Sequence, residues 1–135
     1  MSLLGRFRRA QPPLTSYADD GSLPVLVTAP DAARADSAVL AEAAGRGVDL
    51  AQRVLVRHHL VLPADAVERA RELLGQDGYR LTVVGDGRVR AWRTQLLTAM
   101  GAAQERSRMA GLAQRLGGDV DGWDACGPSG TLPEG

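Results

Sequence analysis

The chain has 135 residues, which suits one domain with a modest hydrophobic core. Apolar residues make up 44% of it and charged residues 24%, an ordinary globular composition that argues against wholesale disorder. Sixteen basic residues, all of them arginine, balance sixteen acidic ones, so no global electrostatic field draws the protein to nucleic acid or to a membrane.

The cysteine content and the length of the apolar runs predict the cellular compartment of the protein. Its one cysteine, Cys126, excludes an intramolecular disulfide and cannot form a thiolate metal cluster alone, so a reduced, cytoplasmic setting is expected. Three arginines among the first nine residues leave no room for the apolar core of about 7–15 residues in a signal peptide. No apolar run approaches the ~20 residues of a membrane-spanning helix.

Composition along the chain predicts three parts. These are an irregular, proline-containing arm over residues 1–24, a single domain over residues 25–126 and a short flexible tail over residues 127–135. Within the domain, the alanine-rich segment 31–44 is typical of a helix that ends at Gly45. Segment 53–62 alternates like a strand, with Val54, Val56, His58 and Leu60 on one face and Arg57 and His59 on the other.

The second half of the domain predicts a hairpin, a helix and a last strand. Residues 79–84 and 88–97 are β-like and are joined by a turn with the Asp-Gly signal of a hairpin. Helical spacing follows over residues 102–116, and a short strand over 119–125 completes the order. With a helix after residue 63, the order is strand, helix, strand, strand, helix, strand. It predicts an α+β fold with a ferredoxin-like, split βαβ, four-stranded antiparallel sheet, two helices on one face and an extra N-terminal helix.

The run GGDVDGWD at residues 117–124 concentrates three carboxylates and a tryptophan after a helix. Glycine at 117 and 118 stops the helix, and Trp123 offers apolar area suited to a core anchor. On a regular strand Asp119 and Asp121 share one face while Asp124 faces the other, so the three do not converge on a metal ion. Two interpretations of these carboxylates remain open: they are solvated, or they contact a partner.

Two segments carry a family resemblance. The first is VRHHL at residues 56–60 with the proline and helix that follow, and the second runs from ERSRM at 105–109 through GGDVDGWDA at 117–125. Together they resemble the regulator of ribonuclease activity B family, also called ribonuclease E inhibitor proteins. The resemblance implies a non-catalytic regulator of RNA decay that binds a protein partner, ribonuclease E or its assembly, without a cofactor or a metal ion.

Candidate partner-binding residues come from these segments, and other functions compete with this one. The expected partner-binding set is Arg57, His58, Asp119, Asp121 and Trp123. Alternatively, an RNA-binding module would use three residues that alternate onto one face of a strand, namely Arg88, Arg90 and Trp92. The weakest alternative is an enzyme that uses Asp121 with His58.

Overall fold

The computed structural model describes residues 16–30 and 35–128. The described elements are β1 (Val25–Ala29), α2 (Asp36–Gly45), β2 (Arg53–Val61), a 3₁₀ turn (Ala64–Ala66), α3 (Val67–Gly75), β3 (Arg80–Gly85), β4 (Arg88–Leu96), α4 (Ala99–Arg115) and β5 (Asp119–Cys126). Residues 16–24 contain neither helix nor strand. Most of the predicted arm, the first residues of the predicted N-terminal helix and nearly all of the predicted tail lie outside the described residues.

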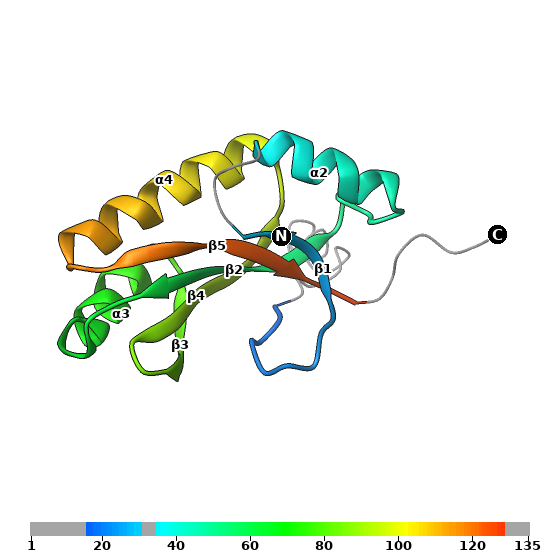
Figure 1. Cartoon of the computed structure of the whole chain (residues 1–135). Helices are drawn as coiled ribbons and strands as arrows, with labels where there is room; N and C mark the ends of the chain where they lie inside the picture. Colours follow the sequence, from blue (N-terminus) through cyan, green and yellow to red (C-terminus); the bar gives the residue numbers. More distant parts are fainter. Residues whose placement is uncertain (1–15, 31–34, 129–135) are drawn as a thin grey trace, which may run out of the picture.

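One antiparallel sheet holds five strands in the order β1-β5-β2-β4-β3 (Figure 1). The α+β class is confirmed, but the predicted strand number is wrong. The four predicted strands are neighbours in the order β5-β2-β4-β3, and the fifth strand, β1, pairs with the outer edge of β5. Five residues without a hairpin signal give little indication of a strand, and β1 forms because β5 offers it an unpaired edge.

All three helices pack on one face of the sheet. In Figure 1, α2 and α4 lie along the same side of β5 and β2. The second core cluster joins Leu74 of α3 and Met109 of α4 to Leu60 of β2. Val54 and Val56, which share a face with Leu60, belong to the first cluster beneath α2. The other face of the sheet, which we call the open face, carries Arg57 and its alternate neighbours.

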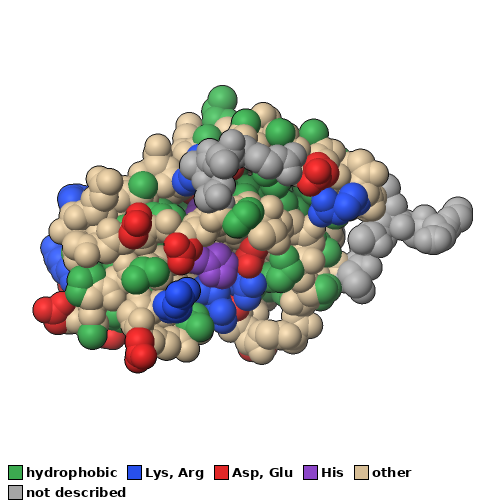
Figure 2. Space-filling view, in the orientation of Figure 1, with side chains coloured by type: hydrophobic (Ala, Val, Ile, Leu, Met, Phe, Trp, Pro, Cys, Tyr) green, Lys and Arg blue, Asp and Glu red, His purple; other side chains and the backbone are tan. Residues whose placement is uncertain are grey.

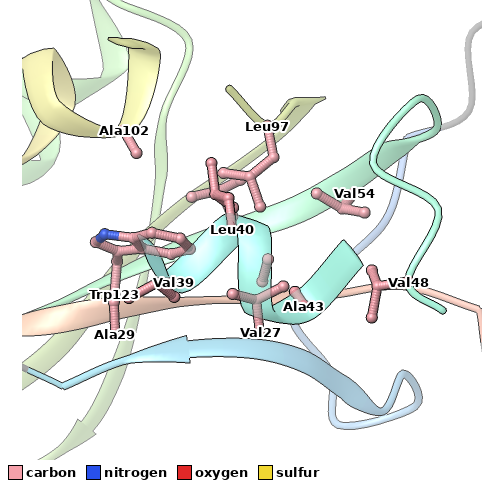
Figure 3. Close-up of a cluster of buried hydrophobic side chains, with 12 residues drawn as sticks. Val27, Ala29, Val39, Leu40, Ala43, Val48, Val54, Leu97, Ala102 and Trp123 are labelled. Carbon is pink, nitrogen blue, oxygen red and sulfur yellow. The ribbon is translucent and has the colours of Figure 1, made fainter. Parts of the chain in front are cut away.

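The first core cluster is built around Trp123 (Figure 3). Its indole lies beside Val39 and Leu40 of α2, and the residue is only 2% exposed. With aromatic residues at 4% of the chain, this ring supplies apolar area that the surrounding Ala and Val side chains do not. Trp123 therefore anchors α2 to the sheet.

Strand β5 contains a β-bulge that reverses its inward and outward positions. Leu60 of β2 pairs with Val120, and His58 pairs with Trp123, so Asp121 and Gly122 together lie opposite His59. The expectation that Asp124 faces away from Asp119 and Asp121 is therefore wrong. The extra residue shifts the alternation by one position, and it brings all three carboxylates to the open face.

Gly122 is the residue that permits this bulge. Its φ is +104°, which L side chains rarely adopt, and a Cβ there would lie 2.3 Å from the carbonyl oxygen of Ala29. The oxygen of Pro30 would be 2.4 Å away. Because both neighbours are backbone atoms at the end of β1 and just after it, a side chain could not be accommodated without moving that strand.

Replacing Gly122 with alanine should therefore destabilise the protein. We expect Gly122→Ala to lower the free energy of unfolding by roughly 2–4 kcal/mol, through backbone strain and collision with the end of β1. Chemical denaturation followed by circular dichroism measures the change. The matched control is Gly111→Ala in α4, where a Cβ meets nothing within 4 Å. That variant should gain about 0.5–1 kcal/mol from helix propensity. Equal stability of the two variants would contradict the role assigned to the bulge.

Candidate protein-binding face

The open face carries a cluster of charged side chains from β2, β4 and β5. Antiparallel register places Arg57 of β2 opposite Asp124 of β5, and it places His59 opposite Arg90 of β4. Asp19, from the segment before β1, completes the cluster. We call these five residues the open-face charge cluster.

Arg57 and Asp124 form a bidentate ion pair. Arg57 Nε lies 2.7 Å from Asp124 Oδ1, and Nη2 lies 2.8 Å from Oδ2. His59 Nε2 is 3.0 Å from the same Oδ2. Two parallel, charge-assisted hydrogen bonds fix the guanidinium in one orientation, with its remaining nitrogen, Nη1, directed elsewhere.

Asp19 bridges Arg57 to Arg90. Its Oδ1 accepts a hydrogen bond from Arg57 Nη1 at 3.0 Å, and its Oδ2 accepts one from Arg90 Nε at 2.7 Å. The Asp19 side chain is 1% exposed, so hydrogen bonds from the two guanidinium groups replace the water that would otherwise solvate its carboxylate. Its position is also held by the backbone, because the Tyr17 N–H donates to Thr94 Oγ1 at 2.9 Å.

The electrostatics of the cluster favour its charged state. Burial raises the pKa of Asp124, but hydrogen bonds and attraction from His59 and Arg57 outweigh it and hold that pKa below its ordinary value. Burial likewise raises the pKa of Asp19, and Arg90 and Arg57 together bring it below the ordinary value. The hydrogen bond to Asp124 raises the pKa of Arg57. Both carboxylates therefore remain ionised at neutral pH.

Exposed charges lie at the edge of this cluster. Arg88 Nη1 is 3.8 Å from Asp121 Oδ2, and the Asp121 side chain is 54% exposed. Asp119 is also exposed. Figure 2 shows acidic, basic and histidine side chains gathered near the middle of the molecule. Unlike the buried pairs, the side chains of Arg88, Asp119 and Asp121 can reach another protein without breaking the fold.

On the helix-covered side, polar contacts join the sheet to α4. His58 Nε2 lies 3.1 Å from Glu105 Oε1, and Gln95 Nε2 donates to Glu105 Oε2 at 2.5 Å. Burial raises the pKa of Glu105, but the bonds from His58 and Gln95 bring it below its ordinary value. The Arg93 guanidinium covers the ring of Tyr79 at 4.2 Å from its centroid. This network connects the two segments that carry the family resemblance.

A second buried contact joins α2, α4 and β5. Trp123 Nε1 donates to Asp36 Oδ1 at 3.3 Å, and Arg106 bonds the other oxygen of that carboxylate. Asp36 is buried at the start of α2, so its charge is balanced by Arg106 rather than by water. The indole nitrogen and the guanidinium thus fix α2 over the sheet.

The structure divides the predicted partner-binding set into two groups. Arg57, Asp119 and Asp121 lie on the open face, whereas His58 and Trp123 are buried on the helix-covered side. A direct contact with a partner is not available to either buried residue, because each is covered by helices. The sequence pattern could not separate the groups, since the bulge and the helix positions determine which side is covered.

The alternative sites have different outcomes. Arg88, Arg90 and Trp92 share the open face, as the alternation predicts, but Arg90 is held by Asp19 and the Trp92 indole N–H donates to Thr82 Oγ1 at 2.8 Å. The geometry contradicts the hypothesis of a catalytic pair formed by Asp121 and His58. Asp121 is on the open face and His58 is buried on the opposite one, so the sheet separates them.

Sequence reasoning missed Asp19. Its two partners are 38 and 71 positions away along the chain, and no local motif indicates such a contact. Throughout residues 16–30 and 35–128, no group of three or more His, Cys, Asp or Glu side chains is arranged to hold a metal ion. Among the described helices, none has the length and apolar character to cross a membrane.

Removing the Asp124 carboxylate should lower stability in a pH-dependent way. A lowered folded-state pKa means that the carboxylate stabilises the fold above its unfolded pKa of about 4, and that this contribution is lost as the pH falls through the folded value. We expect Asp124→Asn to cost about 2–3 kcal/mol near pH 7, because Arg57 loses its bidentate partner.

The difference from wild type should stay constant above about pH 5 and narrow as the pH falls below that, through the lowered folded-state pKa, because the wild-type carboxyl becomes neutral as well. Urea denaturation at several pH values measures it. Asp20→Asn is the control, since the exposed Asp20 carboxylate is hydrogen-bonded to nearby Ser22 rather than to an arginine among the described residues, and the change should leave stability nearly unchanged. A difference for Asp124→Asn that is independent of pH would contradict the assigned ion pair.

Comparison with known proteins identifies the family. The model of the family described as regulator of ribonuclease activity B matches residues 33–125. A search of curated proteins and a search of solved structures each found no match. The matched range includes α2 through most of β5, and thus both resembling segments and the contacts between them. The chain belongs to the regulator of ribonuclease activity B family.

Proposed function

We propose that this protein regulates a ribonuclease by binding the enzyme or its assembly, without catalysis of its own, and that the open face makes the contact. The observation that carries the proposal is the family match, which covers residues 33–125. The resemblance implies ribonuclease E as the target, and we place this action in the cytoplasm. The geometry supports the choice of face.

The residues that mark the family are mostly engaged within the fold. His58 is bonded to Glu105, and Trp123 is bonded to Asp36. These contacts join strands to helices, so they explain why the motif is needed for folding but leave it little access to a partner. Recognition therefore falls to exposed side chains.

The exposed charges of the open face suit a protein partner. Arg88 and Asp121 present opposite charges 3.8 Å apart, and Asp119 lies on the same strand as Asp121. A mixed-charge surface of this kind favours a partner with complementary charges, and it affects the association rate and specificity more than the overall affinity. Zero net charge on the whole chain does not oppose such local recognition.

A second candidate function is direct RNA binding by Arg88, Arg90 and Trp92. It is favoured by the placement of all three on the open face, where a strand could carry phosphate and base contacts. Salt-dependent binding of single-stranded RNA that is lost in an Arg88→Ala variant would support it. RNA binding that is equal in that variant would exclude it.

An inhibition assay tests the proposed function. We expect the purified full chain to slow cleavage of a test RNA by ribonuclease E from the same host, and Asp121→Arg to weaken inhibition about tenfold or more by reversing a contact charge. The matched control is Glu72→Arg on α3, which makes the same charge change at a side chain that is 63% exposed.

Each outcome of this assay has a definite meaning. Glu72→Arg should inhibit like wild type, and thermal unfolding should confirm that both variants are folded. If wild type neither binds the ribonuclease nor slows it, the proposed function is wrong. If Asp121→Arg inhibits as well as Glu72→Arg, the protein is a regulator but the open face is not its contact surface.

A further inference from the structure

The open face is already occupied by a peptide, the chain's own residues 16–20. This segment contacts the sheet through a backbone donor, the Tyr17 N–H on Thr94, and through a carboxylate, that of Asp19. Asp19 Oδ1 accepts a hydrogen bond from the Arg57 guanidinium, and Asp19 Oδ2 accepts one from the Arg90 guanidinium. The next residue, Asp20, is exposed and contacts no arginine in the described structure.

Charge balance shows that Arg90 depends on Asp19 for an anionic partner. Arg57 is neutralised by Asp124 in a bidentate pair, whereas Arg90 has no ion pair in the described structure other than the one with Asp19. Without Asp19, the remaining charges of Arg57, Arg90 and Asp124 sum to one positive charge, and Arg90 is only partly exposed. A partly desolvated cation without a partner is costly, so the vacated position would favour a carboxylate or another anion.

The two arginines lie within the residues that match the family, whereas the segment that covers them does not. Arg57 and Arg90 lie within the matched residues 33–125, but Asp19 precedes them. The arginine pair thus lies within the matched domain, whereas the segment that covers it precedes the matched residues. A covering segment on a family surface is the arrangement expected of an intramolecular competitor.

We infer that Arg57 and Arg90 form a binding site for an aspartate in an acidic segment of a partner protein, and that residues 16–20 compete for this site. This inference rests on the proposed function, since it gives the chemical class of the segment that the ribonuclease or its assembly would present. Binding of the partner displaces Asp19, so residues 16–20 set a threshold for association.

A peptide suits the site better than RNA does. The present occupant shows that a peptide segment can lie here with one backbone hydrogen bond to Thr94 and with a two-oxygen carboxylate between the guanidinium groups. Single-stranded RNA binding typically uses several stacking aromatic side chains, and among the described residues of β4 only Trp92 is aromatic. We therefore assign the site to a protein segment.

Displacement can be tested with the chain's own segment as the probe. The probe is a fluorescein-labelled synthetic peptide with the sequence of residues 16–24, titrated with the full chain and followed by fluorescence anisotropy. Because a tethered segment competes at an effective concentration on the order of millimolar, Asp19→Ala should bind the peptide about tenfold more tightly than wild type. The matched control is Asp20→Ala, which removes the same charge one residue away and should bind as weakly as wild type.

Further variants test the site itself. Adding Arg90→Ala to the Asp19→Ala chain should abolish the gain, and so should a probe peptide with asparagine in place of the aspartate that corresponds to Asp19. Circular dichroism confirms folding of each variant. If Asp19→Ala does not fold, Asp19→Asn provides the same test, because it keeps the shape and removes the charge.

Two results would overturn the inference. One is equal peptide affinity of wild type and a folded Asp19 variant. The other is a gain in affinity for a labelled uridine oligonucleotide of about twelve residues without a gain for the peptide, which would assign the site to RNA. The titration contains no ribonuclease, so its failure leaves the inhibition assay unaffected, and failure of the inhibition assay leaves the peptide site standing.

Discussion

The β-bulge opposite His59 is the constraint on which both faces of the sheet depend. Before it, Val120 points to the helices and Asp119 to the open face; after it, Trp123 points to the helices and Asp124 to the open face. Without the extra residue, the indole would lie among charges and the carboxylate would lie in the core, each at a cost of several kcal/mol. Gly122 makes this shift possible, and the end of β1 fills the space that a side chain would need.

Strand β2 contacts neighbouring elements on both faces of the sheet. Its neighbouring residues Arg57 and His58 point to opposite faces, and each holds a carboxylate from another element, Asp124 of β5 and Glu105 of α4. Buried polar and ionic pairs of this kind contribute little net stability when compared with apolar packing, but losing one partner is costly. They therefore act against alternative registers, because a slip of one residue would leave charges unpaired on both faces.

Local periodicity predicted much of the fold, and the missing parts are those that depend on contacts distant in sequence. The alternation of residues 53–62, the Asp-Gly hairpin and the helix that ends just before Gly117 all follow from spacing of a few residues. By contrast, β1 forms only because β5 has a free edge. The bulge had a signal, a glycine within a strand, but its effect on Asp124 required the register with β2.

The candidate site shows the same limit more sharply, because motif residues and contact residues are different sets. Residues that can be found by pattern, such as His58 and Trp123, are recognisable since the fold needs them, and for that reason they are buried. The surface properties instead depend on Asp19, which lies outside the family match and balances Arg90. With Asp19 in place the four permanent charges of the cluster cancel, and without it they sum to one positive charge. A net charge of zero for the whole chain thus conceals a face whose local charge depends on the position of one short segment.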